Sequence, residues 1–354
     1  MQGDQRPAAV DLFCGAGGLS YGMQRSGIEI AAGVDADPAC RHPFTENVRS
    51  VFCERDIATL APEFVGSLFP ENPVRILAGC APCQPYSPYT NKRTVKDQDW
   101  QLLSKFGELV SELKPDVVTM ENVPQLRHHD VFDDFIQILR DAGYEKPFSK
   151  IVHCASYGVP QSRKRLVILA SRLGEISMIE PTHKPEDYPT VRKAIGWLEK
   201  IDAGSTHEMD HLHKASALTP TNLSRIRSSR PGGTWRDWED DLLATCHTKE
   251  SGQTFGSVYG RMEWDEPAPT LTTQFNGFGN GRFGHPDQDR AISLREGAIL
   301  QTFPRDYSFA PESKPVKMSQ IARMIGNAVP VKLGEAIGES IMVHLGKHTN
   351  SAVG

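Results

Sequence analysis

The feature that most limits the fold of this chain is an alternation of short apolar runs and helical stretches over about its first 170 residues. Runs rich in β-branched and apolar residues predict strands at residues 8–13, 28–34, 51–53, 74–78, 117–120, 151–154 and 166–170. Cap signals or apolar residues three and four apart predict helices at residues 20–25, 38–47, 102–113 and 131–139. This alternation favours an α/β fold, with a mostly parallel sheet between two layers of helices.

A glycine-rich turn follows the first predicted strand. Residues 13–18 read Phe-Cys-Gly-Ala-Gly-Gly, and an acidic residue, Asp35, lies about 20 residues further on. This arrangement is weakly typical of dinucleotide binding, but Ser20 stands where that pattern has its third glycine. Taken alone, the turn leaves the ligand open, and Asp35 and Asp56 could equally be solvated loop carboxylates.

A cysteine between two prolines follows the fourth predicted strand. Pro82 and Pro85 fix their own φ and restrict the preceding residue, so the Cys83 side chain is presented in a defined direction. A thiol held in this way suits a nucleophile. Two other interpretations remain, namely a buried structural cysteine and a Cys80-x-x-Cys83 pair of the kind found in redox couples and zinc sites.

The cysteines and histidines elsewhere favour neither a disulfide framework nor a metal site. Seven cysteines, an odd number spread along the chain, are typical of a reducing compartment. His207, His211 and His213 have no cysteine nearby, and no second cysteine pair follows at zinc spacing. The sequence also shows no apolar run long enough for a membrane span and no signal-peptide core. We therefore expect a cytoplasmic protein with no metal and no membrane association.

Five motifs occur in a fixed order and together point to one family. They are Asp-Leu-Phe-Cys-Gly-Ala-Gly-Gly at 11–18, Pro-Cys-Gln at 82–84, Glu-Asn-Val at 121–123, Gln-Ser-Arg-Lys-Arg at 161–165 and Gly-Asn-Ala-Val-Pro at 326–330. From residue 8 to residue 338 the chain resembles the cytosine-C5 DNA methyltransferases of bacterial restriction-modification systems. The resemblance implies a Rossmann-like, S-adenosylmethionine-dependent methyltransferase domain at 1–182 plus 316–354, and a smaller target-recognition domain at 183–315.

The resemblance also implies a reaction, the transfer of a methyl group to C5 of a cytosine flipped out of duplex DNA. Because C5 of cytosine is a poor nucleophile, a nucleophile must first add at C6, and that role falls to Cys83. Glu121 would contact ring N3 and the 4-amino group, while Arg163 and Arg165 would hold the O2 edge and the nearby sugar-phosphate. A role in restriction-modification or phage defence is expected.

S-adenosylmethionine is the cofactor that the resemblance implies, with S-adenosylhomocysteine as its product. Asp35 would hold the ribose hydroxyls, Asp56 and Ile57 would flank the adenine, and Asn327 would return the C-terminal segment to the pocket. Many family members have Glu and a bulky apolar residue where this chain has Asp35 and Ala36. The expected cofactor-binding residues are Phe13, Cys14, Gly15, Ala16, Gly17, Gly18, Leu19, Asp35, Ala36, Asp56, Ile57 and Asn327.

Double-stranded DNA is the expected partner, although the formal net charge is -5. Residues 211–236 carry five Lys and Arg and no Asp or Glu, a run that fits either DNA contact or a solvated face. Residues 261–270 resemble the family motif that supports target recognition. Residues 183–259 are therefore expected to read the bases. Residues 87–97 would close over the DNA. The expected DNA-binding residues are Ser87, Lys92, Arg93, Arg225, Arg227, Arg230, Thr234 and Arg236.

Three other functions share some of these sequence features. A tRNA cytosine-5 methyltransferase shares the same motifs but usually has a shorter recognition region. A redox protein would need both Cys80 and Cys83, whereas the methyltransferase needs only Cys83. A DNA-binding protein with a dead active site should lack Cys83 or Glu121, and this chain has both. We expect a monomer, with a cognate restriction endonuclease or defence proteins as further partners.

Overall fold

The computed structural model describes residues 6–71, 74–82, 98–249, 252, 254 and 256–349. These residues form two compact units. The first unit comprises Met1–Tyr157, Lys164–Thr182 and Val329–Gly354, and the second unit comprises Gly158–Arg163 and His183–Ala328. The chain therefore leaves the first unit twice and returns to it for its final helix.

A seven-stranded sheet forms the centre of the first unit, in the order β3-β2-β1-β4-β5-β8-β6. Neighbouring strands from β3 to β5 run parallel, and β8 pairs antiparallel with both β5 and β6. The prediction of a mostly parallel sheet is confirmed. The strands are β1 (Ala8–Leu12), β2 (Glu29–Asp35), β3 (Val51–Glu54), β4 (Arg75–Gly79), β5 (Val117–Asn122), β6 (Phe148–His153) and β8 (Lys164–Ser171).

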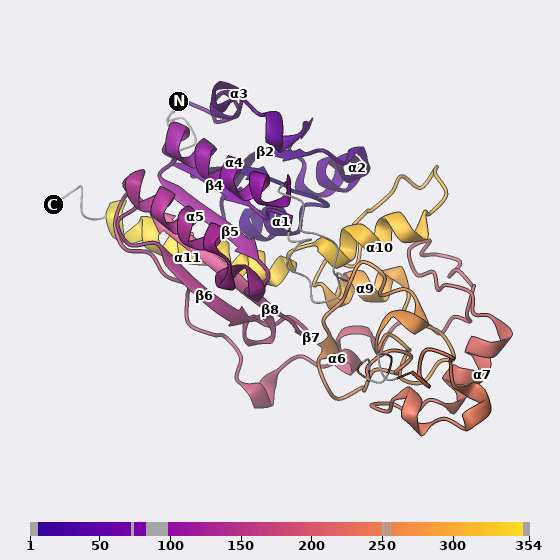
Figure 1. The fold of residues 1–354 in the computed structure, drawn as a ribbon. Helices are drawn as coiled ribbons and strands as arrows, with labels where there is room; N and C mark the ends of the chain where they lie inside the picture. The colour runs from indigo at the N-terminus through magenta and orange to yellow at the C-terminus, as the bar shows by residue number, and fades with distance from the viewer. Residues whose placement is uncertain are drawn as a thin grey trace. The chain divides into compact units, whose positions relative to one another are not determined.

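Helices cover both faces of this sheet (Figure 1). One layer contains α3 (Pro62–Ser67), α4 (Gln98–Leu113) and α5 (Asp130–Asp141), and the other contains α1 (Gly18–Arg25) packed against α11 (Val331–Thr349). The helix predicted at 38–47 is broken into a 3-10 turn, the short α2 (Arg41–Pro43) and a π-helical turn at Phe44–Val48. None of the described helices is long and apolar enough to cross a membrane.

Helix α5 shows how the sequence pattern produces the packing. Its apolar residues recur three and four positions apart, so Val131, Phe135 and Leu139 lie on one buried face. Burying each such side chain contributes about 1.5–3 kcal/mol, which outweighs the weak helix propensity of its aromatic residues. Gly143, at φ 94°, lets the chain turn into the next strand just after the helix ends.

The second unit has little regular structure. It contains α6 (Val191–Ile195), α7 (Pro220–Ser228), α9 (Leu294–Leu300), α10 (Met318–Asn327) and a parallel pair of two-residue strands, β7 (Gln161–Ser162) and β9 (Ala268–Pro269). Ile226, Trp235, Trp238, Phe278 and Ala291 form an apolar cluster within it. Among the described residues, the loops that join these elements are mostly irregular.

Candidate active site

Three parallel strands end side by side and bring the sequence motifs of the first unit together. Leu12 at the end of β1 pairs with Gly79 at the end of β4, and Gly79 pairs with Met120 of β5. The carboxyl ends of such strands are where ligands bind in open α/β sheets. The glycine-rich turn, the residues leading to Cys83 and the Glu121 side chain therefore lie along one edge of the sheet.

The glycine-rich turn adopts a conformation that needs its glycines. Phe13, Gly15 and Gly17 have φ of 61°, 53° and 90°, and Gly17 is the N-cap of α1. A Cβ added at Gly15 would meet no atom within 4 Å. The turn thus leaves open space over its backbone, as expected where a ligand approaches closely. Cys14, Ala16, Gly18 and Leu19 are buried beneath it.

Two carboxylates fix this turn. Asp35 accepts hydrogen bonds from the Gly15 N–H at 2.9 Å and the Asp37 N–H at 2.8 Å, and burial raises its pKa against the opposing effect of these bonds. Asp11 is buried and accepts a 2.5 Å hydrogen bond from the Ser20 hydroxyl, which ties α1 to β1. Burial raises the pKa of Asp11 to about 7. Ser20 thus has a structural reason to replace the third glycine.

The remaining predicted cofactor residues lie in three places. Ala36 is exposed just after β2, and Asp56 is exposed at the start of a 3-10 turn, where it accepts a hydrogen bond from the Ala58 N–H at 3.0 Å. Ile57 is buried next to Asp56. Asn327 belongs to the second unit, where it is the exposed last residue of α10.

Glu121 is the buried carboxylate at the end of β5, with 3% of its surface exposed. Its Oε1 atom lies 2.8 Å from Nε of Arg165 on the adjacent strand β8. The two groups form an ion pair without an aligned hydrogen bond, so Oε1 accepts none from the described residues. Its Oε2 atom accepts a hydrogen bond from the Cys80 thiol at 2.9 Å.

The chain leading to Cys83 is held from two sides. The Cys80 N–H donates to the Leu12 carbonyl at 3.3 Å, and the Asn122 side-chain amide donates to the Ala81 carbonyl at 3.1 Å. Cys83 itself, together with Ser87, Lys92 and Arg93, lies outside the described residues. Cys80 and Asn122 were missed as site residues, although Asn122 belongs to the Glu-Asn-Val motif and Cys80 directly follows a strand that neighbours β5.

Arg163 belongs to the second unit, and 2% of its surface is exposed. Its guanidinium donates to the carbonyls of Leu271 at 3.0 Å, Gly326 at 3.3 Å and Ala328 at 3.4 Å. A Cβ at Gly326 would fall 2.3 Å from the Thr272 carbonyl oxygen. The Arg163 and Gly326 motifs therefore join three chain segments of this unit.

Among the predicted DNA-binding residues, Arg227, Arg230 and Arg236 are exposed. Arg227 lies 3.2 Å from Asp289 and Arg230 lies 3.2 Å from Asp237, so part of the positive run is neutralised by residues outside it. Arg225 is half-buried, donates to the Leu242 carbonyl at 2.8 Å and packs over Trp238. Thr234 caps a 3-10 turn and accepts from the Arg236 N–H. These contacts give Arg225 and Thr234 structural roles.

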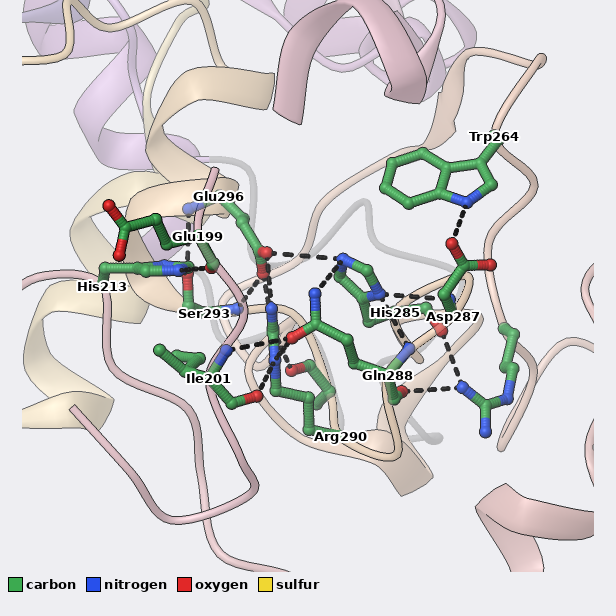
Figure 2. A network of polar contacts seen from close by, with 12 residues as sticks. Glu199, Ile201, His213, Trp264, His285, Asp287, Gln288, Arg290, Ser293 and Glu296 are labelled. Atoms are coloured by element: carbon green, nitrogen blue, oxygen red, sulfur yellow. Dashed lines mark hydrogen bonds and ion pairs between the residues drawn. The ribbon is translucent and has the colours of Figure 1, made fainter. Parts of the chain in front are cut away.

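A buried polar network holds the irregular loops of the second unit together (Figure 2). Arg290, fully buried, donates to both carboxylate oxygens of Glu296 at 2.7 Å and to the carbonyls of Ile201 and Ala291. Burial alone would raise the pKa of Glu296, but the hydrogen bonds and charge of Arg290 lower it to about 2. Neither Arg290 nor Glu296 belongs to a recognised motif, so the sequence gives no sign of this pair.

The histidines of the second unit serve this network and its surroundings. His213 contacts the Ser293 hydroxyl and the Glu199 carbonyl, both at 2.8 Å, and His207 contacts the Glu199 carboxylate at 2.9 Å. Nδ1 of His285 accepts hydrogen bonds from the N–H groups of Asp287 and Gln288, and burial lowers its pKa to about 4. Across the described ranges, no group of three or more His, Cys, Asp or Glu residues could hold a metal ion.

The seven-stranded sheet, with the glycine-rich turn and the buried Glu121 at one edge, has an α/β methyltransferase architecture. Solved structures with the same fold include an E. coli prophage protein described as a DNA modification methyltransferase, at 23% identity with a TM-score of 0.74 over 96% of this chain and 99% of that one. Another is Spodoptera frugiperda DNMT2, at 18% identity with a TM-score of 0.66 over 95% of this chain and 99% of that one.

Sequence comparison identifies the family. Residues 8–343 match the C-5 cytosine-specific DNA methylases, and the chain belongs to this family. It is 52% identical over 337 residues to the type II methylase M.HgiDII of Herpetosiphon aurantiacus, covering 94% of each chain. It is also 31% identical to the type II methyltransferase M.PspPI of Psychrobacter sp., covering 94% of this chain and 78% of that one. The prediction of a DNA cytosine-C5 methyltransferase is confirmed. Membership of this family rules out the alternative of a redox protein.

Proposed function

We propose that this protein methylates C5 of a flipped cytosine in a specific duplex DNA sequence, through a covalent adduct between Cys83 and C6, within a type II restriction-modification system. The observation that carries the proposal is the buried Glu121 carboxylate, held on the same sheet edge as the chain that leads to Cys83. The type II names of relatives up to 52% identical support the restriction-modification setting.

The cofactor proposal is S-adenosylmethionine, which the family uses, and the residues present fit it. Open space over Gly15 admits close approach to the backbone of the turn. The Asp35 carboxylate accepts hydrogen bonds from the Gly15 and Asp37 N–H groups and has further acceptor capacity for a ribose hydroxyl. When bound, the cofactor supplies an electrophilic methyl group. The glycine-rich turn would hold its amino-acid end, while Asp56 and Ile57 would hold its adenine.

Catalysis by this chain rests on a thiol and a carboxyl group. The Cys83 sulfur would form a bond to C6 of cytosine, which raises the electron density at C5 and makes C5 the nucleophile. The Glu121 carboxyl group would contact N3 and the 4-amino group, where charge develops as the thiol adds. Once C5 carries the methyl group, loss of its proton and expulsion of the thiol would restore the aromatic ring and the free Cys83.

Arg165 would support this step by holding Glu121 from the adjacent strand.

Removing the cytosine from the duplex costs a few kcal/mol. Contacts from the second unit, which we propose as the target-recognition part, would offset this cost. Its exposed Arg227, Arg230 and Arg236 are the described candidates for phosphate contacts.

The test is to sequence the DNA of cells that express this chain after bisulfite conversion. We expect protected cytosines in one short sequence motif, and none in cells expressing Glu121→Ala or an empty vector. Randomly distributed protection, or none at all with a folded protein, would refute sequence-specific DNA methylation. The same experiment on cellular tRNA tests the alternative substrate.

A further inference from the structure

Cys80 has no part in the proposed chemistry, yet its thiol contacts the carboxylate at the centre of that chemistry. The Cys80 Sγ–H donates to Glu121 Oε2 at 2.9 Å, and Glu121 is almost wholly buried. A hydrogen bond to a buried carboxylate is stronger than one in water, and its loss leaves an acceptor without a partner. This contact is therefore more than a consequence of packing.

The register of the sheet explains why the thiol reaches this atom. Gly79, the last residue of β4, pairs with Met120. The residues that follow these two, Cys80 and Glu121, therefore also lie next to each other. The backbone on either side of the thiol is fixed by the Leu12 carbonyl and the Asn122 amide. Because these backbone contacts do not involve the sulfur, truncating the side chain should leave the loop in place.

The two neighbours of Glu121 act on different oxygens. Arg165 lies against Oε1, and Cys80 donates to Oε2. The last torsion of a glutamate side chain has a broad, shallow energy profile, so contact at one oxygen alone leaves the plane of the carboxylate free to rotate. Contact at both oxygens fixes that plane.

We propose that Cys80 is a positioning residue for the methyl-transfer reaction. Its thiol fixes the plane of the Glu121 carboxylate so that this group meets N3 and the 4-amino group of the target cytosine together. The inference rests on the proposed role of Glu121, and it assigns no redox function to Cys80. A serine hydroxyl is also a hydrogen-bond donor, so it should replace the thiol, whereas alanine should not.

The test measures single-turnover methyl transfer from labelled S-adenosylmethionine to a duplex that carries the sequence found by bisulfite analysis. Cys80→Ala should lower the rate about fivefold, the effect of losing one net hydrogen bond. Its affinity for the cofactor should not change, and its melting temperature should fall by only a few degrees, as expected for the loss of about 1 kcal/mol. Cys80→Ser should retain most of the rate. Cys53→Ala removes another half-buried cysteine of the first unit and serves as the matched control.

A double-mutant cycle with Glu121→Gln decides whether Cys80 acts through Glu121. In the Glu121→Gln background, Cys80→Ala should cause no further loss, because the carboxylate that it positions is gone. Any of three results would overturn the inference. They are equal rates for the wild type and Cys80→Ala, multiplicative losses in the double mutant, and a folded Cys80→Ser that is as slow as Cys80→Ala. If Glu121→Gln alone transferred methyl groups at the wild-type rate, the proposed role of Glu121 would fail, and the role of Cys80 with it.

Discussion

Replacing Glu296 by glutamine should destabilise the second unit strongly, because it leaves the Arg290 charge buried without its partner. The guanidinium is fully buried and donates to both oxygens of Glu296 at 2.7 Å. The same carboxylate accepts the Ser293 N–H at 2.6 Å and completes the N-terminal cap of α9. Removing one partner of such a buried pair costs about 3–5 kcal/mol.

Urea denaturation followed by tryptophan fluorescence measures this effect. Trp197, Trp235, Trp238 and Trp264 lie in the second unit, so the emission reports mainly on its unfolding. Glu263→Gln is the matched control, since it makes the same chemical change at a half-exposed carboxylate 4.0 Å from Arg282. We expect a clear fall in the midpoint for Glu296→Gln and almost none for Glu263→Gln. Equal midpoints for the two variants would refute the role assigned to the network.

Three further outcomes are expected. Cys83→Ser should lose methyl transfer while cofactor affinity, measured by calorimetry, stays near the wild-type value, because a hydroxyl is a far weaker nucleophile; an active Cys83→Ser enzyme would contradict the mechanism. Changing Arg227 and Arg230 together to glutamine should lower the log-log salt dependence of DNA binding by about two units, since each phosphate contact contributes about one. The control is Arg192→Gln, which removes an exposed, ion-paired arginine of the second unit outside the 211–236 run. A slope unchanged from that of the control would place the DNA surface elsewhere. Burial lowers the pKa of His285 from 6.5 to about 4, so between these pH values the folded state binds fewer protons than the unfolded state. The stability of the fold should therefore be complete above pH 6.5 and fall as the pH drops toward 4. A His285 NMR titration centred near pH 6.5 would contradict this.

The strands and the active-site motifs could be predicted because they follow local rules. Apolar runs located the strands, and the resemblance to a family identified the motifs. The register of the sheet then shows that the glycine-rich turn, Cys80 and Glu121 lie along one edge. The hydrogen bond from the Gly15 N–H to Asp35 was not predicted, because Asp35 was assigned only to the ribose of the cofactor.

Contacts between residues far apart in sequence could not be predicted. The positive run at 211–236 meets Asp289 in space, and Arg163 binds the carbonyl of Gly326. Side-chain bonds to backbone carbonyls, such as those of Arg225 and Arg290, hold loops that have no periodic pattern. Such contacts leave no trace in a local window of sequence, so arginines that resemble surface charges proved to be structural.

The most direct test of the central claim uses duplex DNA whose target cytosine carries fluorine at C5. After the Cys83 sulfur adds to C6 and C5 receives its methyl group, fluorine cannot leave as a cation, so the protein should stay bonded to the DNA. The predicted result is an adduct that needs S-adenosylmethionine, survives denaturing electrophoresis, is absent in Cys83→Ser and forms more slowly in Glu121→Gln. Methyl transfer to unmodified DNA without any such adduct, or peptide mapping that places the DNA on Cys80 or Cys154, would contradict the account.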